Sequence, residues 1–251
     1  MTKETVDILV SGGGLAGMMT AAVFGHAGFR VLLADPAQPV TEAEAEGSDL
    51  RSTAFLAPSR DLLARVGVWD VLAPHATPLE VLEAVDSSGW PPVVRERRAF
   101  QASDLGAEPF GWNLMNWLTK RELPAVLNDR PGIELCYGVG VADILTRDRE
   151  AVVKLSDGRR VTARLVIGAD GRNSAVREAA GIGADTIRYG QKALAFTVTH
   201  PVAHGNVSTE IYNDGGAFTM VPLNDHEGRP ASAIVWMNPG PKVQDLAALE
   251  T

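Results

Sequence analysis

The sequence of 251 residues has little cysteine, no long apolar run and no basic tract. Its one cysteine, Cys136, cannot form an internal disulfide, and a cysteine-ligated zinc site would need further cysteines. No stretch approaches the roughly 18 consecutive apolar residues of a membrane-spanning helix. The first residues lead directly into a strand-like pattern and lack the apolar segment and small-residue cleavage site of a signal peptide. Together these absences favour a soluble, cytoplasmic protein.

Basic residues are too few and too scattered for a general nucleic-acid binder. The 23 Lys and Arg against 31 Asp and Glu give a net charge of −8, whereas phosphate neutralisation requires clustered basic side chains. Hydrophobic residues make up 45% and charged residues 22% of the chain, close to the globular average, which excludes a disordered or collagen-like protein. A chain of this length buries a sizeable core as one large domain or two ordinary ones.

The N-terminal region has the pattern of one βαβ unit. An apolar strand over 6–10 precedes a glycine-rich turn, a helix over 15–27 and a second apolar strand over 30–34. Gly28 occupies the position after the helix end, where a left-handed backbone is common. This order of elements predicts a Rossmann-like parallel sheet.

The turn carries the pattern G-x-G-x-x-G between the strand and the helix. Its glycines permit a tight turn, close approach of a pyrophosphate and tight packing of helix on strand. The helix N-terminus supplies N–H donors for phosphates, and Asp35, at the end of the second strand, can accept both hydroxyls of an adenosine ribose. The acid does not separate FAD from NAD but disfavours NADP; a purely structural turn is the alternative. The residues predicted to bind the dinucleotide here are Gly12, Gly14, Leu15, Ala16, Gly17 and Asp35.

A second signature, G-A-D-G-R-N-S-A-V-R, occupies residues 168–177 after an apolar strand. By itself it fits a simple turn with Ser174 near a helix start. Together the two glycine motifs resemble the group A flavin-dependent aromatic hydroxylases, which are similar to p-hydroxybenzoate hydroxylase. Residues 49–54 resemble the family's D-x-R-x-x-A segment, and residues 59–70 resemble the following helix of the ubiquinone-biosynthesis hydroxylases. The resemblance covers essentially the whole chain.

The resemblance implies roles for further residues. Arg51 would contact the flavin dinucleotide, since a guanidinium binds phosphate bidentately; a solvated loop arginine is the alternative. Asn116 would be a polar flavin contact or a helix N-cap, or both. Asp170 and Gly171 would contact the pyrophosphate side of FAD and help NAD(P)H engage. We nominate no catalytic side chain, because the chemistry of such enzymes belongs to the cofactor.

The resemblance also implies an α/β fold in which a Rossmann-like FAD-binding domain is interleaved with an antiparallel β-sheet substrate domain, truncated at the C-terminus. Residues 1–73 and 103–183 would form the first domain, and residues 74–102 and 184–251 an incomplete second one. Family members carry a third, Gly-Asp motif, and nothing after Gly190 matches it. We therefore expect weak flavin retention, and self-association through the surface exposed by truncation.

Patterns beyond the first motif predict the remaining elements. Asp86–Gly89 and Asp157–Gly158 are turn signals, each between two strands. Pro124 should kink its helix or shift the helix boundary, and a final helical stripe from Val243 should be cut off at Thr251. Strands are expected at 79–85, 93–100, 133–137, 139–146, 151–155, 161–168, 193–199, 208–212, 217–223 and 231–237, and helices at 58–66, 116–129 and 174–180.

The histidine pair and the arginine-rich run of the sequence are each interpreted first as a structural feature. His200 and His204 are four residues apart, but Pro201 breaks any helix, so no metal site is predicted. The RERR run at 95–98 fits a charged edge strand, and contact with anionic lipid is its second interpretation. Cys136 is expected to pack in the core.

The function that the resemblance implies is FAD- and NAD(P)H-dependent hydroxylation of a small phenolic, prenylated substrate by dioxygen. It is closest to the ubiquinone-biosynthesis hydroxylases, with a location in the cytoplasm and peripheral contact with the inner membrane. One alternative is another FAD-superfamily oxidoreductase, such as a prenyl reductase; a halogenase would carry a W-x-W-x-I-P segment, which is absent. The other is a non-catalytic, truncated FAD-binding fragment.

Overall fold

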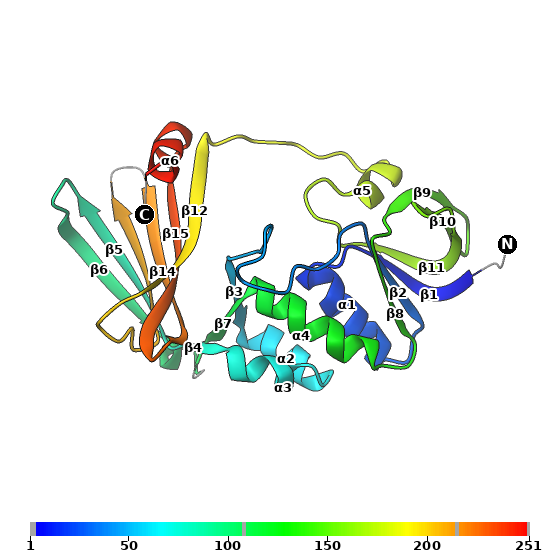
Figure 1. Ribbon diagram of the computed structural model, residues 1–251, viewed down its shortest axis with the longest axis horizontal. Helices are drawn as coiled ribbons and strands as arrows, with labels where there is room; N and C mark the ends of the chain where they lie inside the picture. The colour runs from blue at the N-terminus through cyan, green and yellow to red at the C-terminus, as the bar shows by residue number, and fades with distance from the viewer. Residues whose placement is uncertain (1–3, 107–108, 214–215, 250–251) are drawn as a thin grey trace. The chain divides into compact units, whose positions relative to one another are not determined.

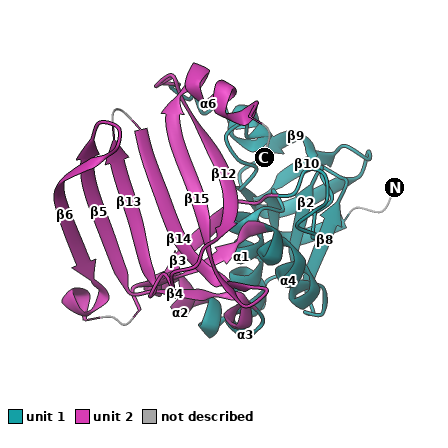
Figure 2. Cartoon of the chain, turned by 60° about the vertical axis from the view of Figure 1, so that its left-hand side comes forward, with its two compact units in different colours: residues 1–48, 63–71, 117–185 teal, residues 49–62, 72–116, 186–251 magenta. Residues whose placement is uncertain are grey.

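The computed structural model describes residues 4–106, 109–213 and 216–249. The chain divides into two compact units, which Figure 2 shows in different colours. Residues 49–62 and 103–116, expected from the sequence in the FAD-binding domain, belong to unit 2. Unit 1 comprises residues 1–48, 63–71 and 117–185, and unit 2 comprises residues 49–62, 72–116 and 186–251.

Unit 1 is built on a sheet that has six strands within the described residues, in the order β8-β2-β1-β11-β10-β9 (Figure 1). The first four strands are parallel, and β10 and β9 continue the sheet antiparallel. The Asp157–Gly158 turn joins β10 to β11 as predicted, with Gly158 at φ +90°. The strands are β1 (Glu4–Ser11), β2 (Val31–Asp35), β8 (Ile133–Tyr137), β9 (Val141–Thr146), β10 (Ala151–Leu155) and β11 (Arg160–Gly168).

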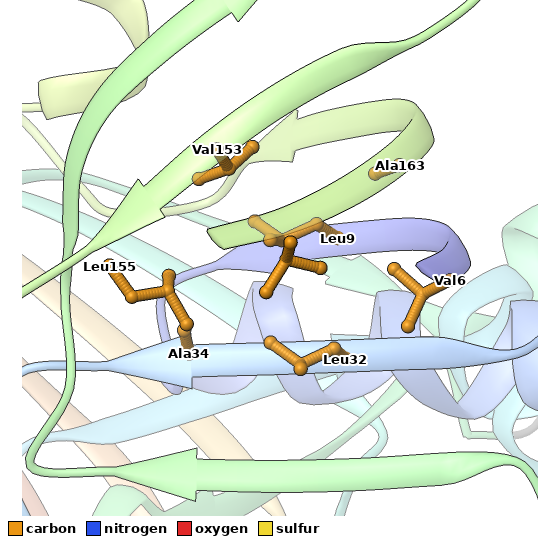
Figure 3. Packing of buried hydrophobic residues seen from close by; sticks show 8 residues of the cluster. Val6, Leu9, Leu32, Ala34, Val153, Leu155 and Ala163 are labelled. Carbon is orange, nitrogen blue, oxygen red and sulfur yellow. The ribbon is translucent and has the colours of Figure 1, made fainter. Parts of the chain in front are cut away.

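Apolar side chains from neighbouring strands form the core of this sheet (Figure 3). Leu9 and Leu32 are completely buried, and removing such a side chain from water contributes about 1.5–3 kcal/mol. Cys136 packs against this cluster but is only half-buried, so it borders the core instead of lying within it as expected. The cluster consists of Val6, Leu9, Leu32, Ala34, Val153, Leu155, Val161 and Ala163.

The helices start and stop close to the positions that sequence signals predict. Helix α1 packs against β1 and β2 and ends before Gly28, which has φ +86°. Helix α4 continues through Pro124, so the proline neither ends the helix nor shifts its boundary. In the described ranges, every helix falls short of the length and apolarity that a bilayer crossing requires. The helices are α1 (Leu15–His26), α2 (Ala57–Arg65), α3 (Trp69–Leu72), α4 (Asn116–Asn128), α5 (Ala175–Ala179) and α6 (Gly240–Ala247), with 3₁₀ turns at Ala73–His75 and Ala102–Leu105.

Unit 2 contains a large sheet in the order β12-β15-β14-β13-β5-β6. It is not purely antiparallel as expected, because β13 pairs with β5 in parallel. Hairpins force antiparallel pairing within β5–β6, β13–β14 and β14–β15, whereas β5 and β13 meet from distant segments that no hairpin constrains. The strands are β5 (Val81–Ser88), β6 (Val93–Gln101), β12 (Gln191–Thr199), β13 (Val207–Asn213), β14 (Gly216–His226) and β15 (Arg229–Pro239).

Three details of unit 2 differ from the sequence predictions. Asp86 to Ser88 belong to β5, so the turn before β6 starts later, at Gly89. A small sheet of β3 (Ser52–Leu56), β7 (Gly111–Met115) and β4 (Thr77–Leu79) was not predicted. Helix α6 ends at Ala247 instead of running on through Leu249, and Thr251 lies outside the described residues.

Candidate dinucleotide-binding site

The glycine-rich turn is packed so tightly that two of its glycines exclude any side chain. Gly12 has φ +110°, and a Cβ there would overlap the carbonyl of Ala169. A Cβ on Gly17 would overlap the carbonyl oxygen of Gly12. The Gly12 N–H donates to the Ala34 carbonyl at 2.8 Å. The turn is therefore held against neighbouring backbone, as the first and last glycine of the motif require.

The middle glycine faces open space. Gly14 is the N-cap of α1, and a Cβ built on it would meet nothing within 4 Å. No side chain caps the helix, and no acidic residue lies in its first turn. Leu15 is half-buried and Ala16 is exposed. The backbone N–H groups and the positive end of the helix dipole are therefore available to an anion beside Gly14, which fits a pyrophosphate.

Asp35 lies beside this turn, at the end of β2. Its Oδ2 accepts from the Gly13 N–H at 2.5 Å, and its Oδ1 accepts from the Ala37 N–H at 2.8 Å. An ionised carboxylate has about four acceptor positions, so Asp35 retains capacity for ribose hydroxyls. Tyr137 borders the same spot, since a Cβ on Gly13 would lie 2.8 Å from its ring. Burial, together with the Asp35 charge, raises the pKa of Tyr137 to about 12, so the ring stays neutral.

The structure brings the two glycine motifs together. Strand β1 pairs in parallel with β11, placing Ser11 opposite Gly168, and the Ala169 N–H donates to the Ser11 carbonyl at 2.7 Å. Beyond this point the Asp170 carboxylate accepts hydrogen bonds from three groups. They are the Ser11 hydroxyl at 3.3 Å, the Val176 N–H at 3.2 Å and the Ser174 hydroxyl. Asp170 therefore ties the turn after β1 to the turn after β11.

Ser174 caps helix α5, as the simpler interpretation of the second signature predicted. Its hydroxyl accepts from the Arg177 N–H at 3.0 Å while it donates to Asp170. Gly171 has φ +81°, and a Cβ there would meet nothing within 4 Å. The segment can therefore be both a helix cap at Ser174 and a contact with FAD at Gly171, because the residues that form the cap leave the backbone at Gly171 open.

The hydrogen bonds around Asp170 predict a pH-dependent stability. Burial would raise the pKa of Asp170, but the bonds from Ser174, Val176 and Ser11 outweigh it and hold the pKa below the ordinary 3.8. A lowered folded-state pKa stabilises the protein above the unfolded pKa, and this contribution is lost as the pH falls through the folded value. We expect Asp170→Asn to lower the free energy of unfolding by about 1–3 kcal/mol at neutral pH.

Urea unfolding of the wild type and of Asp170→Asn at neutral and acidic pH measures this difference. The gap between the two proteins should shrink as the pH falls below 3.8. Asp148→Asn, at an exposed loop carboxylate, is the matched control and should leave stability unchanged. A pH-independent gap would show that the ionised carboxylate is not what joins the two turns.

Arg51 and Asn116 lie together in unit 2, linked by Asp49. The Arg51 Nε and Nη2 each donate to Asp49 at 2.7 Å, and the Asn116 Nδ2 donates to it at 3.1 Å. Hydrogen bonds from Arg51, opposed by burial, lower the pKa of Asp49 to about 2. Thr53 donates to the Asn116 Oδ1 at 2.6 Å. The Arg51 side chain is 64% exposed, so it lies at the surface with its orientation set by Asp49.

Several of these residues were missed by sequence reasoning. Asp49 was quoted within the D-x-R-x-x-A segment, yet only its arginine was nominated. Ser11 and Tyr137 carry no motif signal, since their positions follow from strand pairing across the sheet. Asn116 is the first residue of α4, and its side chain faces Asp49 and Thr53.

The two histidines are satisfied by structural contacts. The His200 ring contacts the Val202 carbonyl at 2.6 Å and the Ser232 hydroxyl at 3.0 Å, and His204 contacts the Leu223 carbonyl at 3.1 Å. Over residues 4–106, 109–213 and 216–249, no group of three or more His, Cys, Asp or Glu side chains is placed to hold a metal ion.

A model of the FAD binding domain family matches residues 5–245. The chain belongs to this family. The dinucleotide that this family binds is FAD. Asp35 alone could not distinguish FAD from NAD, and the family match makes this distinction. The match to an FAD binding domain confirms the flavin-binding part of the resemblance.

Curated relatives of this FAD binding domain chain include ubiquinone hydroxylases. The chain is 33% identical to the ubiquinone hydroxylase UbiL of Rhodospirillum rubrum over 247 residues, covering 98% of this chain and 55% of the relative. It is 28% identical to the 3-demethoxyubiquinol 3-hydroxylase of Escherichia coli, covering 98% and 61%. The chain thus spans about half to three fifths of the length of these relatives.

Solved structures confirm the fold. Pseudomonas aeruginosa PqsL matches with a TM-score of 0.78 at 20% identity, covering 98% of this chain and 64% of PqsL. The p-nitrophenol 4-monooxygenase PnpA of Pseudomonas putida matches with a TM-score of 0.75 at 19% identity, covering 97% and 62%. The α/β fold class with a second large sheet is therefore that of FAD-dependent monooxygenases.

Proposed function

We propose that this chain belongs to an FAD- and NAD(P)H-dependent monooxygenase that hydroxylates a phenolic ring of the ubiquinone-precursor type. The observation that carries the proposal is the meeting of the two glycine motifs at the ends of β1 and β11, beside an uncapped helix N-terminus. The names of the relatives, several of them ubiquinone hydroxylases, support the substrate class.

Specific residues are proposed to hold the cofactor. The turn and the first residues of α1 would bind the pyrophosphate, and Asp35 would accept the ribose hydroxyls. Asp170 would act mainly by positioning, since three protein donors already occupy its carboxylate, while Gly171 would offer open backbone. Arg51 and Asn116 are retained as flavin contacts on resemblance alone. Bound FAD would supply the redox chemistry between NAD(P)H and dioxygen.

The large sheet of unit 2 is proposed to shape the aromatic substrate site. Phe218 and Trp236 are opposite each other on β14 and β15, with ring centroids 5.8 Å apart in an edge-to-face arrangement. Met220 and Pro222 follow on the same face of β14, because alternate residues of a strand share a face. These half-buried to buried side chains form an apolar surface of the kind that a phenolic ring requires.

Incubating the protein with FAD, NAD(P)H, phenolic ubiquinone precursors and isotopically labelled dioxygen tests this function. Mass spectrometry should detect one labelled oxygen per hydroxylated product, matched by NAD(P)H consumption. A saturated isoprenoid chain without label would favour the prenyl-reductase alternative. Flavin binding without any product would favour a non-catalytic FAD-binding fragment.

Arg51 provides a specific test of the flavin contacts. Arg51→Met should weaken FAD binding between about tenfold and a hundredfold, because a charge-assisted hydrogen bond to phosphate contributes about 1.5–3 kcal/mol. Arg159→Met is the matched control: Arg159 also donates through Nε to an aspartate two residues earlier, at 2.6 Å. Fluorescence titration with FAD measures both affinities. Equal affinities for the two variants would remove Arg51 from the site.

The proposal also includes a cytoplasmic location with peripheral membrane contact, and self-association of the chain. Exposed apolar side chains would mediate the self-association, and Leu165, which is 46% exposed, is one of them among the described residues. Analytical ultracentrifugation measures such association directly.

A further inference from the structure

The turn between β5 and β6 presents an unusually exposed apolar tip. Trp90 is 91% exposed, Val93 66% and Val94 52%. Pro91 and Pro92, between them, are also exposed. Strand β6 forms the edge of the large sheet (Figure 2) and is exposed along its whole length. Tryptophan is commonly placed where an apolar ring meets a polar boundary, as at membrane interfaces, so such a tip suits an interfacial role.

The tip itself carries one charged residue, and that residue is basic. The stretch from Ser87 to Arg95 contains Arg95 and no acidic residue, whereas Asp86 and Glu96 flank it on β5 and β6. Arg95, which directly follows the valines, donates through Nε to the Ser88 hydroxyl at 3.0 Å. The apolar tip is therefore followed immediately by a cation held beside the turn.

Two further arginines, Arg97 and Arg98, belong to β6 and point to opposite faces of the sheet. Arg97 is opposite Val85 and Arg98 is opposite Ala84 in the β5–β6 register, so consecutive side chains point to different faces of the sheet. At about 3.3 Å per residue, Arg97 lies about 13 Å along the strand from Val93. If the tip of the hairpin enters a lipid headgroup layer, Arg97 and Arg98 therefore lie on the two faces of the hairpin behind it.

The acidic neighbours of these arginines do not prevent phosphate binding. Arg97 lies 3.4 Å from Glu83 and Arg98 lies 2.8 Å from Glu96, with the arginine side chains 59% and 72% exposed. Exposed ion pairs of this kind contribute little net free energy. A lipid phosphate can therefore replace either carboxylate at small cost.

We propose that the β5–β6 tip docks on anionic lipid membranes, with Trp90, Val93 and Val94 inserted at the headgroup level and the three arginines facing lipid phosphates. A membrane contact rests on the proposed function in one respect, because a prenylated aromatic substrate partitions into the bilayer. The observations that support the contact all come from the β5–β6 hairpin. The interpretation of the RERR run as a charged edge strand is confirmed. The second interpretation, contact with anionic lipid, is supported by the exposed apolar side chains of Trp90, Val93 and Val94 next to the run.

Vesicle sedimentation of the 251-residue protein tests the proposal without FAD or NAD(P)H, so a failure of the proposed flavin chemistry would not alter the result. The wild type should bind phosphatidylcholine vesicles containing phosphatidylglycerol, and bind less at high salt. Trp90→Ala should weaken binding about tenfold, equivalent to about 1.4 kcal/mol. Replacing Arg95, Arg97 and Arg98 together by glutamine should abolish the preference for phosphatidylglycerol.

Tyr189→Ala is the matched control, because Tyr189 is an aromatic residue that is 80% exposed elsewhere in unit 2. It should bind vesicles like the wild type, and circular dichroism should show all variants folded. Equal binding by Trp90→Ala and Tyr189→Ala would overturn the proposal, as would no vesicle binding by the wild type. A dimer without vesicles that Trp90→Ala dissociates would instead assign the tip to a contact between copies, and would also overturn it.

Discussion

Replacing Gly14 by valine should lower the affinity for FAD about a hundredfold while leaving the protein folded. A Cβ at this position meets nothing within 4 Å, so the valine projects into the open space beside the N-terminus of α1. It would block two or more hydrogen bonds from backbone N–H groups to the pyrophosphate, each contributing about 1.5 kcal/mol. The change at the helix N-cap itself costs only about 1 kcal/mol of stability.

Two other glycines serve as controls for this prediction. Gly183→Val also places a side chain in open space in unit 1 and should leave FAD affinity unchanged. Gly17→Val, in contrast, would force a side chain against the Gly12 carbonyl and should prevent folding. Circular dichroism separates the unfolded Gly17→Val from the two folded variants, and fluorescence titration with FAD then measures the affinities of Gly14→Val and Gly183→Val. Wild-type affinity in Gly14→Val would mean that the turn is only structural.

Asp35→Ala should weaken FAD binding between about tenfold and a hundredfold. The ribose hydroxyls would lose a charged acceptor contributing about 1.5–3 kcal/mol. The Gly13 N–H would lose its partner as well, which loosens the turn itself. Isothermal titration calorimetry with FAD measures the loss.

Asp7→Ala is the matched control for Asp35. The Asp7 carboxylate also accepts from a backbone N–H, that of Arg30 at 3.0 Å, but it lies on β1 away from the turn. Asp35→Asn, which retains one acceptor oxygen, should fall between Asp35→Ala and the wild type. If Asp7→Ala and Asp35→Ala weakened FAD binding equally, Asp35 would have no special role toward the ribose.

The local parts of this fold could be predicted from the sequence because their signals are local. Strand β1, helix α1 and strand β2 follow one another within the first 35 residues, and each is marked by periodicity, by glycine or by a terminal acid. The Asp157–Gly158 hairpin and the cap at Ser174 are equally short-range. Such features depend on a few consecutive residues, so one sequence is enough to specify them.

The parts that escaped prediction depend on contacts between distant segments. Strands β3 and β7 pair residue 52 with residue 115, and neither is recognisable without the other. The parallel pairing of β5 with β13 brings together Val81 and Val207, and no turn residue encodes its direction. The same holds within the site, where Asp170 bonds to Ser11 across the sheet. Local patterns nominated candidate cofactor-binding residues, but they did not indicate how long-range pairing arranges those residues.

We propose that the turn after β1, together with Asp35, binds the adenosine diphosphate half of FAD. Calorimetric titration of the 251-residue protein with FAD, ADP and riboflavin tests this role, since the three ligands separate the two halves of the cofactor. We predict that ADP and FAD bind with similar affinity, that Gly14→Val weakens both, and that riboflavin does not bind. Tight binding of riboflavin together with no binding of ADP would contradict the claim.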